Sequence, residues 1–355
     1  MVANTQYKPN LDVFRSICVL LVIATHVLGS INFNGYPQQS NLFRHIWYVG
    51  SFGVTGFFVL SAYLLSSILL KEKELGRIKK SNFYMRRVLR IYPLYFACIV
   101  TIFIINKMSS QPLDLHLINY VTFTANYASY GWQESNPLLH FWSICVEEQF
   151  YLLLPWLLLL SKRRLNILLS TLIPISIVSR FFLSDLLPYP AVWNFSTSHL
   201  DSFALGILIA LNLNSLIIHV KKVRKLKFIL IFSTLLLALI CASSFQLVYT
   251  SNLSSITYSF AAVIFSLFLV VASFEKWDFR GKKIFIYIGQ RSFGLYVFHW
   301  PVLHYTKVVS QTEFLKIESA LVVIAITFIL SELSYRYLES PFMKARVKFQ
   351  TVRTN

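Results

Sequence analysis

Long apolar stretches recur along the whole chain, each roughly 20 residues long and separated from the next by a shorter polar gap. A helix of about 20 apolar residues spans the ~30 Å of hydrocarbon in a bilayer. The stretches predict about ten membrane-spanning helices, at residues 11–31, 45–70, 88–106, 141–160, 166–183, 200–219, 228–244, 255–274, 287–308 and 317–339. The predicted fold is therefore an all-α, polytopic helix bundle in a lipid bilayer.

Composition agrees with a membrane protein, because 56% of the residues are hydrophobic and only 14% are charged. The formal net charge of +18 raises the alternative of a nucleic-acid-binding protein. The distribution of the charge argues against a nucleic-acid partner, since the basic residues gather in alternate gaps, near 71–87, 162–164, 221–227, 276–283 and 344–353. This is the positive-inside pattern, and with an even number of helices it predicts that both termini lie in the cytoplasm.

One domain is expected, because no linker, repeat or low-complexity stretch divides the chain. Residues 1–340 form the predicted transmembrane domain, and residues 341–355 form a basic cytoplasmic tail. The four cysteines all fall in apolar stretches and lack the spacing of metal ligands, so we expect no metal site.

The first apolar stretch carries two ionisable residues, Arg15 and His26. Eleven residues at 100° each return to within about 20° of the same face, so the two side chains share one face about 16 Å apart along the axis. Arg15 is expected near the cytoplasmic surface and His26 in the outer half of the bilayer. Because ionisable groups are expensive in lipid, the pair indicates a functional site. The alternative is an arginine that reaches the interface and a buried, hydrogen-bonded histidine.

The fourth stretch contains two adjacent carboxylates, Glu147 and Glu148. Its predicted direction places Glu147 at nearly the depth of His26, and Tyr151 lies one turn later on the same face. A carboxylate at that depth is able to orient an imidazole and stabilise its charged form, as in a catalytic pair. The alternative is a histidine–glutamate pair that serves helix packing only.

Three arginines, Arg86, Arg87 and Arg90, lie where the third predicted helix leaves the cytoplasm. Arg87 and Arg90 are three residues apart and share a face. Guanidinium groups bind phosphates through paired, charge-assisted hydrogen bonds, so this segment predicts a phosphate site. For Arg86 the alternative is an ordinary basic residue at the membrane boundary.

Further polar and aromatic residues fall in the outer half of the predicted bundle. Asp201 lies near the outer end of the sixth helix, His299 lies well inside the ninth, and Trp142 opens the fourth. We expect Trp142, Tyr151, Asp201, His299 and Glu148 to contact a substrate. Trp142 has the alternative role of an interface anchor.

Seven segments, taken in order, resemble the acyltransferase-3 family of membrane acyltransferases, and they cover almost the whole chain. They are LDVFR with TH ten residues after its arginine, GFFVLSAYLL, FYMRRVLRIYP, HFWSICVEEQFYLLLPW, HLDSFALGILIA, RSFGLYVFHWP and SYRYLESPF. The resemblance implies transfer of an acyl group, usually acetyl from cytoplasmic acetyl-CoA, to a glycan. Such acceptors include O-antigen and other lipopolysaccharide sugars, exopolysaccharide and peptidoglycan. A bacterial inner membrane is the implied location.

The resemblance also implies roles for individual residues. His26 matches the essential histidine of the family, and Arg15 matches its partner. Arg87 and Arg90 match the arginine pair after the second helix, and Glu147 lies in the glutamate–tyrosine segment.

This sequence departs from the family pattern at a few positions. The usual Ser-Gly of the second helix is Ser61-Ala62, and His199 stands where an arginine is common, which leaves the role of Asp201 open. Many members carry an additional hydrolase-like domain outside the membrane. None follows the predicted bundle here, so we expect the membrane core to complete the transfer.

These features combine into one mechanistic hypothesis. Arg15, Arg87 and Arg90 hold the phosphates of acetyl-CoA, while His26 acts as general base and Glu147 orients it. Direct attack on the thioester and a transient acetyl group on His26 both fit the sequence. The alternative function is a proton-coupled transporter or a glycan flippase or exporter, which also places His, Glu and Arg in the membrane.

Overall fold

The computed structural model describes residues 7–31, 41–109, 117–128, 136–187, 191–222, 254–275, 277–312 and 315–350, without the side chains of 41–51, 191 and 254. These residues form helices, and the only strand-like pairing among them is a single bridge between Ile31 and Leu315. The predicted all-α class is confirmed.

The long helices of the bundle follow most of the predicted stretches. They are α1 (Pro9–Leu28), α2 (Asn41–Glu74), α3 (Lys80–Met108), α6 (Trp142–Leu157), α7 (Lys162–Leu186), α9 (Leu200–Lys222), α11 (Ser254–Phe274), α13 (Ser292–Ser310) and α14 (Ile317–Ser334). The shorter elements are α4 (Leu117–Val121), α5 (Ala125–Ala128), η1 (Leu139–Phe141), α8 (Ala191–Asn194), η2 (Ser196–His199), α12 (Lys282–Gln290), η3 (Tyr335–Glu339), α15 (Ser340–Arg346) and η4 (Val347–Phe349). The predicted helix 228–244 lies outside the described residues.

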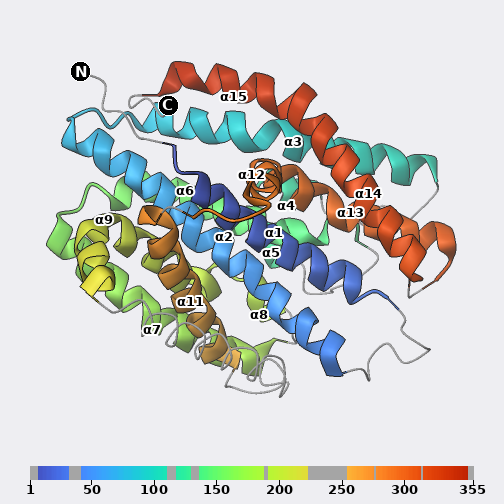
Figure 1. The fold of residues 1–355 in the computed structure, drawn as a ribbon, viewed down its shortest axis with the longest axis horizontal. Coiled ribbons are helices and arrows are strands. Elements are labelled where there is room, and N and C mark those ends of the chain that lie inside the picture. The colour runs from blue at the N-terminus through green and yellow to red at the C-terminus, as the bar shows by residue number, and fades with distance from the viewer. Residues whose placement is uncertain are drawn as a thin grey trace.

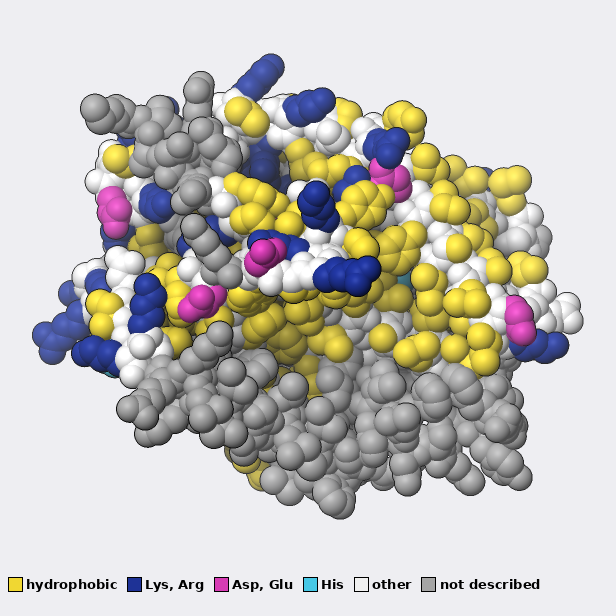
Figure 2. All heavy atoms as spheres, viewed as in Figure 1, with side chains coloured by type: hydrophobic (Ala, Val, Ile, Leu, Met, Phe, Trp, Pro, Cys, Tyr) yellow, Lys and Arg dark blue, Asp and Glu magenta, His cyan; other side chains and the backbone are white. Residues whose placement is uncertain are grey.

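Seven helical segments within the described ranges are long and apolar enough to cross a membrane. They are Pro9–Leu28, Phe52–Glu74, Lys80–Met108, Lys162–Leu186, Ser196–Lys222, Ser255–Phe274 and Ile317–Phe349. The chain is therefore an integral, multi-pass membrane protein, while the count of ten and the cytoplasmic termini stay predictions. Its surface agrees, since apolar side chains such as Met108 and Val309 are 81% and 84% exposed. Figure 2 shows hydrophobic side chains across the centre and right of one face, with most Lys and Arg side chains toward its top and left.

Three predicted boundaries differ from the structure in ways that matter for the site. Helix α3 begins at Lys80, eight residues before the predicted start, so its three arginines lie inside a helix. The stretch predicted as one helix at 287–308 breaks at Arg291, where α12 ends and α13 begins. Residues 341–346, predicted as tail, belong to α15, which continues from α14 through the π-helical turn η3 and packs against α3.

Helix α1 lies within the bundle and packs against α2, α11, α12 and α13 (Figure 1). Glycines allow the closest helix contacts. A Cβ atom on Gly53 of α2 would lie 2.5 Å from the carbonyl oxygen of Cys18, and one on Gly206 of α9 would lie 2.4 Å from that of Val59. Gly53 therefore allows the close contact between α1 and α2, and Gly206 allows that between α2 and α9.

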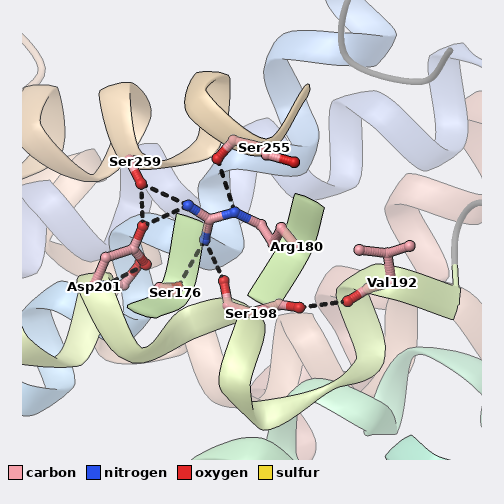
Figure 3. Close-up of polar contacts among 8 residues, drawn as sticks. Ser176, Arg180, Val192, Ser198, Asp201, Ser255 and Ser259 are labelled. Carbon is pink, nitrogen blue, oxygen red and sulfur yellow. Dashed lines mark hydrogen bonds and ion pairs between the residues drawn. The ribbon is translucent and has the colours of Figure 1, made fainter. Parts of the chain in front are cut away.

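A buried ion pair joins α7, α9 and α11 (Figure 3). Arg180 of α7, 1% exposed, donates from Nη2 to Oδ2 of Asp201 at 2.9 Å and to Oγ of Ser259 at 2.5 Å. Its Nε donates to the carbonyl oxygen of Ser255 at 2.9 Å, and its Nη1 donates to that of Ser198 at 2.5 Å. One guanidinium therefore satisfies polar groups from three helices at once.

This cluster corrects the substrate-binding role predicted for Asp201. Oδ2 accepts from Arg180 and Ser259, and Oδ1 accepts from the backbone N–H of Ser202 at 2.7 Å. The carboxylate is buried and both of its oxygens are engaged, so it serves helix packing. The family pattern commonly has an arginine two residues before this aspartate, where this chain has His199. The positive partner of Asp201 is instead Arg180, which lies on another helix.

Arg180→Ala is expected to lower the free energy of unfolding by about 3–5 kcal/mol, because Asp201 would remain as an unpaired buried charge. The double variant Arg180→Ala/Asp201→Ala should lose less than the sum of the two single variants. The measurement is thermal or denaturant unfolding of the detergent-solubilised protein. Arg163→Ala, an exposed position on the same helix, is the control. Equal losses at Arg180 and Arg163 would contradict this role.

Candidate active site

A large cavity of about 1340 Å³ opens among the ends of α1, α2, α3, α7 and α9. Its lining contains eight basic residues and only two acidic ones, Asp12 and Glu74. The basic residues are Lys8, Arg15, Lys71, Lys73, Arg87, Arg90, Lys162 and Arg346. A hollow lined mainly by one sign of charge concentrates the opposite charge, so the cavity is suited to an anion.

Two residues that line the cavity just before α1, Tyr7 and Lys8, have shifted pKa values. Burial, followed by the nearby Lys71 ammonium, lowers the pKa of Lys8. Burial and the hydrogen bond to Asp12 raise the pKa of Tyr7 to about 12, so its hydroxyl stays protonated and donates to Asp12 at 2.5 Å. Asp12 in turn accepts from Arg15 at 2.5 Å and holds that guanidinium at the cavity wall.

A second cavity of about 160 Å³ shares Arg15, Arg87 and Arg90 with the large one. Its remaining polar lining is Ser61, Ser143, Glu147, Tyr151, Ser292 and Tyr296. The shared arginines make the two cavities adjacent compartments. A ligand anchored in the large cavity is thus able to extend between α2, α3, α6 and α13.

The arginines of α3 have different partners. Arg90 pairs with Glu339 of η3 at 3.1 Å and still lines both cavities. Arg86 pairs with buried Glu72 at 3.0 Å and lines neither cavity, so the structure does not bring it into the predicted phosphate site.

Two arginines at the cavity keep a buried donor free. Within the described part of the chain, Nε of Arg87 and Nε of Arg346 have no hydrogen-bond partner. Buried polar atoms are nearly always satisfied in folded proteins. Both residues line the large cavity, where their positive charge favours a bound anion.

The two adjacent glutamates of α6 face different surroundings, as their helical spacing predicts. Glu147 and Tyr151 both line the smaller cavity, where the hydroxyl groups of Tyr151 and Ser61 are 2.6 Å apart. Glu148 is buried, lines neither cavity and has no partner for Oε1 among the described residues. Of the two, only Glu147 is therefore placed to meet a ligand in these cavities.

His26, in the last turn of α1, lies beside His299 of α13. Its Nδ1 is 2.9 Å from Nε2 of His299, and the two rings stack with their centroids 5.1 Å apart. Trp300 packs its ring edge-on against His26 at 5.0 Å. No hydrogen bond or ion pair between His26 and Glu147 occurs in the parts of the chain that the structure describes. The predicted pairing was wrong because equal depth in the bilayer does not fix which helix faces which.

Tyr296 connects the histidine pair with the smaller cavity. The residue lines that cavity, and its carbonyl oxygen lies 2.6 Å from Nδ1 of His299. Trp142, predicted to contact substrate, instead stacks on His199 at 5.5 Å. The predicted residues thus fall into three groups, namely those at the cavities, the histidine pair, and the packed residues Arg86, Trp142, Glu148 and Asp201.

Sequence reasoning missed several residues of this site. Lys71, Lys73 and Lys162 belong to the basic gaps that report topology, Lys8 precedes the first apolar stretch, and Arg346 belongs to the predicted tail. The sequence shows that these residues are positively charged, but only the fold shows that they line one cavity. Ser61, Ser143 and Tyr296 carry no signal in the sequence that separates them from ordinary polar residues in a helix.

Comparison with known proteins gives a consistent result. A family model described as an acyltransferase domain matches residues 8–336. The chain is 28% identical to the peptidoglycan O-acetyltransferase OatA of Listeria monocytogenes, over 96% of this chain and 56% of that protein. It is 27% identical to the O-acetyltransferase OatA of Staphylococcus aureus, over 97% of this chain and 58% of that protein. The chain therefore spans little more than half the length of these relatives. No solved structure matches it.

Arg87→Gln and Arg346→Gln are each expected to weaken the binding of pyrophosphate to the solubilised protein about three- to tenfold, because each removes a charge-assisted donor. The measurement is isothermal titration calorimetry at fixed ionic strength. The control is Arg280→Gln, which removes an exposed arginine outside the cavity. Unchanged affinity in Arg346→Gln would remove α15 from the anion site.

Proposed function

The chain belongs to the acyltransferase family whose model matches residues 8–336, and on that premise we propose that it is a membrane O-acetyltransferase. It moves an acetyl group from cytoplasmic acetyl-CoA to a hydroxyl group of a surface or lipid-linked glycan. One observation carries this proposal. A strongly basic cavity adjoins a smaller polar cavity, and Tyr296 of the smaller cavity binds the histidine pair through its carbonyl group.

The large cavity suits the phosphate end of the donor. Arg87 and Arg346 offer free buried donors, while Arg15 and Arg90 line both compartments. Guanidinium groups bind phosphate oxygens through paired hydrogen bonds, which fixes the ligand as well as attracting it. The nucleotide end of acetyl-CoA therefore binds here, and its thioester arm extends into the smaller cavity.

The lining of the smaller cavity suits that arm. Ser61, Tyr151 and Glu147 present hydroxyl and carboxylate oxygens among apolar side chains of α2, α3 and α6. The two amide N–H groups of the thioester arm need acceptors once water is excluded. We assign this role to Glu147, in place of the orienting role on His26 that the geometry does not support.

His26 lines neither cavity, and Tyr296 stands between the smaller cavity and the histidine pair. The acetyl end of the donor consequently displaces the side chains around Tyr296 when it reaches His26. The acceptor hydroxyl approaches from the opposite side, since His26 lies in the last turn of α1 and is partly exposed.

The chemistry then needs one base. His26 takes the proton of the acceptor hydroxyl while its oxygen attacks the thioester carbonyl carbon. A carbon–oxygen bond forms, the carbon–sulfur bond breaks, and the proton passes from His26 to the CoA sulfur. Electrons and protons balance without a metal or a redox partner.

The acceptor is a glycan of the cell envelope, and peptidoglycan is the first to test. One relative is named a peptidoglycan O-acetyltransferase, and the match to it covers nearly the whole of this chain. A bacterial plasma membrane is the corresponding location, with the basic cavity on the cytoplasmic side as the charge pattern predicts.

His26→Ala is expected to lower acetyl transfer at least 1,000-fold while leaving the Kd for CoA within twofold, because the base does not hold the phosphates. Arg90→Gln should weaken CoA binding about tenfold. The assay uses inverted membrane vesicles with acetyl-labelled acetyl-CoA, following label in the glycan fraction and release of free CoA.

His219→Ala, at an exposed position near the end of α9, is the control histidine. Equal losses of CoA binding in His26→Ala and Arg90→Gln would contradict the separation of the two roles. Wild-type vesicles that bind CoA but release none of it from acetyl-CoA in the presence of glycan would favour the transporter alternative.

A further inference from the structure

The hydrogen bonds around His299 determine where its protons lie. Its Nδ1 is 2.6 Å from the carbonyl oxygen of Tyr296, which is able only to accept, so Nδ1 carries a hydrogen. His299 is fully buried, and no carboxylate bonds to it in the described ranges, so we assign the neutral ring. The other nitrogen, Nε2, then holds a lone pair.

The same reasoning extends to His26. Its Nδ1 lies 2.9 Å from Nε2 of His299, and two lone pairs do not bond to each other. Nδ1 of His26 must therefore carry a hydrogen and donate it to His299. In a neutral ring this leaves Nε2 of His26 without a hydrogen, and that atom has no hydrogen-bond partner in the described part of the chain.

We propose that His299 is a positioning residue that holds His26 in the Nδ1–H tautomer and so leaves Nε2 as the basic atom. This proposal rests on the proposed function, in which His26 is the base. A base hydrogen-bonded at its second nitrogen has both its tautomer and its ring orientation fixed. The usual partner for this task is a carboxylate, whereas here it is a second neutral histidine.

Two neighbouring aromatic rings pack against His26 and His299. Trp300 packs edge-on against His26, and His140 packs edge-on against His299 with ring centroids 5.0 Å apart. Nε2 of His140 lies 3.1 Å from the carbonyl oxygen of Val297, so its hydrogen is directed at the backbone of α13. His140 consequently packs against the pair and does not compete for the hydrogen bond between His26 and His299.

The chain of hydrogen bonds also determines the path of the transferred proton. When Nε2 of His26 takes the hydroxyl proton, the bond from Nδ1–H to His299 becomes charge-assisted and stronger. His299 passes no proton onward, because its own Nδ1–H is directed at the Tyr296 carbonyl. The proton therefore stays on His26 and returns to the departing CoA sulfur.

The first test compares His299→Leu with His299→Gln. Leucine removes the acceptor, so kcat should fall about 100-fold with the KM for acetyl-CoA within twofold. Glutamine offers a side-chain oxygen as acceptor and should recover at least tenfold of that loss. His219→Leu, outside the site, should behave as wild type. Equal defects in the leucine and glutamine variants, or a loss that falls on KM alone, would overturn the positioning role.

The second test does not depend on turnover. Solid-state ¹⁵N NMR of histidine-labelled wild-type protein in bilayers reports which ring nitrogen carries the hydrogen, and the His26 signals are identified by their absence in His26→Gln. The expected result is a hydrogen on Nδ1 and none on Nε2. A hydrogen on Nε2 would overturn the proposal even if acetyl transfer is established.

The two tests separate this inference from the function on which it rests. If His26→Gln keeps full acetyl transfer, the assignment of His26 as the base fails, and with it the positioning role of His299. If His26→Gln is inactive but His299→Leu retains wild-type kcat, the base is correct and only the role of His299 fails.

Discussion

The hydrocarbon core of a bilayer offers no water to polar groups, so each one that enters it must find its partner within the protein. This constraint governs the whole arrangement. Arg180 satisfies it through five hydrogen bonds that reach three helices. Arg86 pairs with Glu72 and donates to the carbonyl oxygen of Phe349, while its Nη2 has no hydrogen-bond partner among the described residues. Both arginines connect the helix that carries them to other elements of the bundle.

Some groups of the candidate site do not meet this constraint within the described residues. Arg87 and Arg346 keep a buried donor without a partner in the described chain, and Nε2 of His26 has none there either. An unsatisfied polar group is costly, and it is retained where a ligand supplies the missing partner. A missing partner does not identify a functional residue by itself, since Oε1 of Glu148 also lacks one among the described residues and Glu148 lines neither cavity. At Arg87 and Arg346 the missing partner coincides with a place in the cavity lining.

The division of the site into two layers follows from the same physics. Cations near the membrane surface reach water and phosphate, so the basic cavity lies among helix ends. His299 is fully buried, where a charge would be poorly solvated and neutral imidazoles are tolerated through mutual hydrogen bonding. An extended donor with phosphates at one end and a thioester at the other matches this gradient.

Much of this was available from the sequence alone. Apolar length fixes the membrane-spanning helices, helical spacing places Glu147 and Tyr151 on one face, and the ordered motifs indicate the acyltransferase family. These properties are local, since each depends on residues within one helix or on their order along the chain. The family model and the shared cavity of Glu147 and Tyr151 confirm them.

Only the tertiary structure decided which helices face one another. His299 rather than Glu147 bonds to His26, Arg180 rather than a neighbour in sequence pairs with Asp201, and Arg346 of the predicted tail joins the cavity. Periodicity fixes the face of a residue on its own helix and its depth in the bilayer. It leaves open the rotation and neighbours of that helix, which depend on close contacts such as those at Gly53 and Gly206 and on the hydrogen bonds that a waterless interior requires.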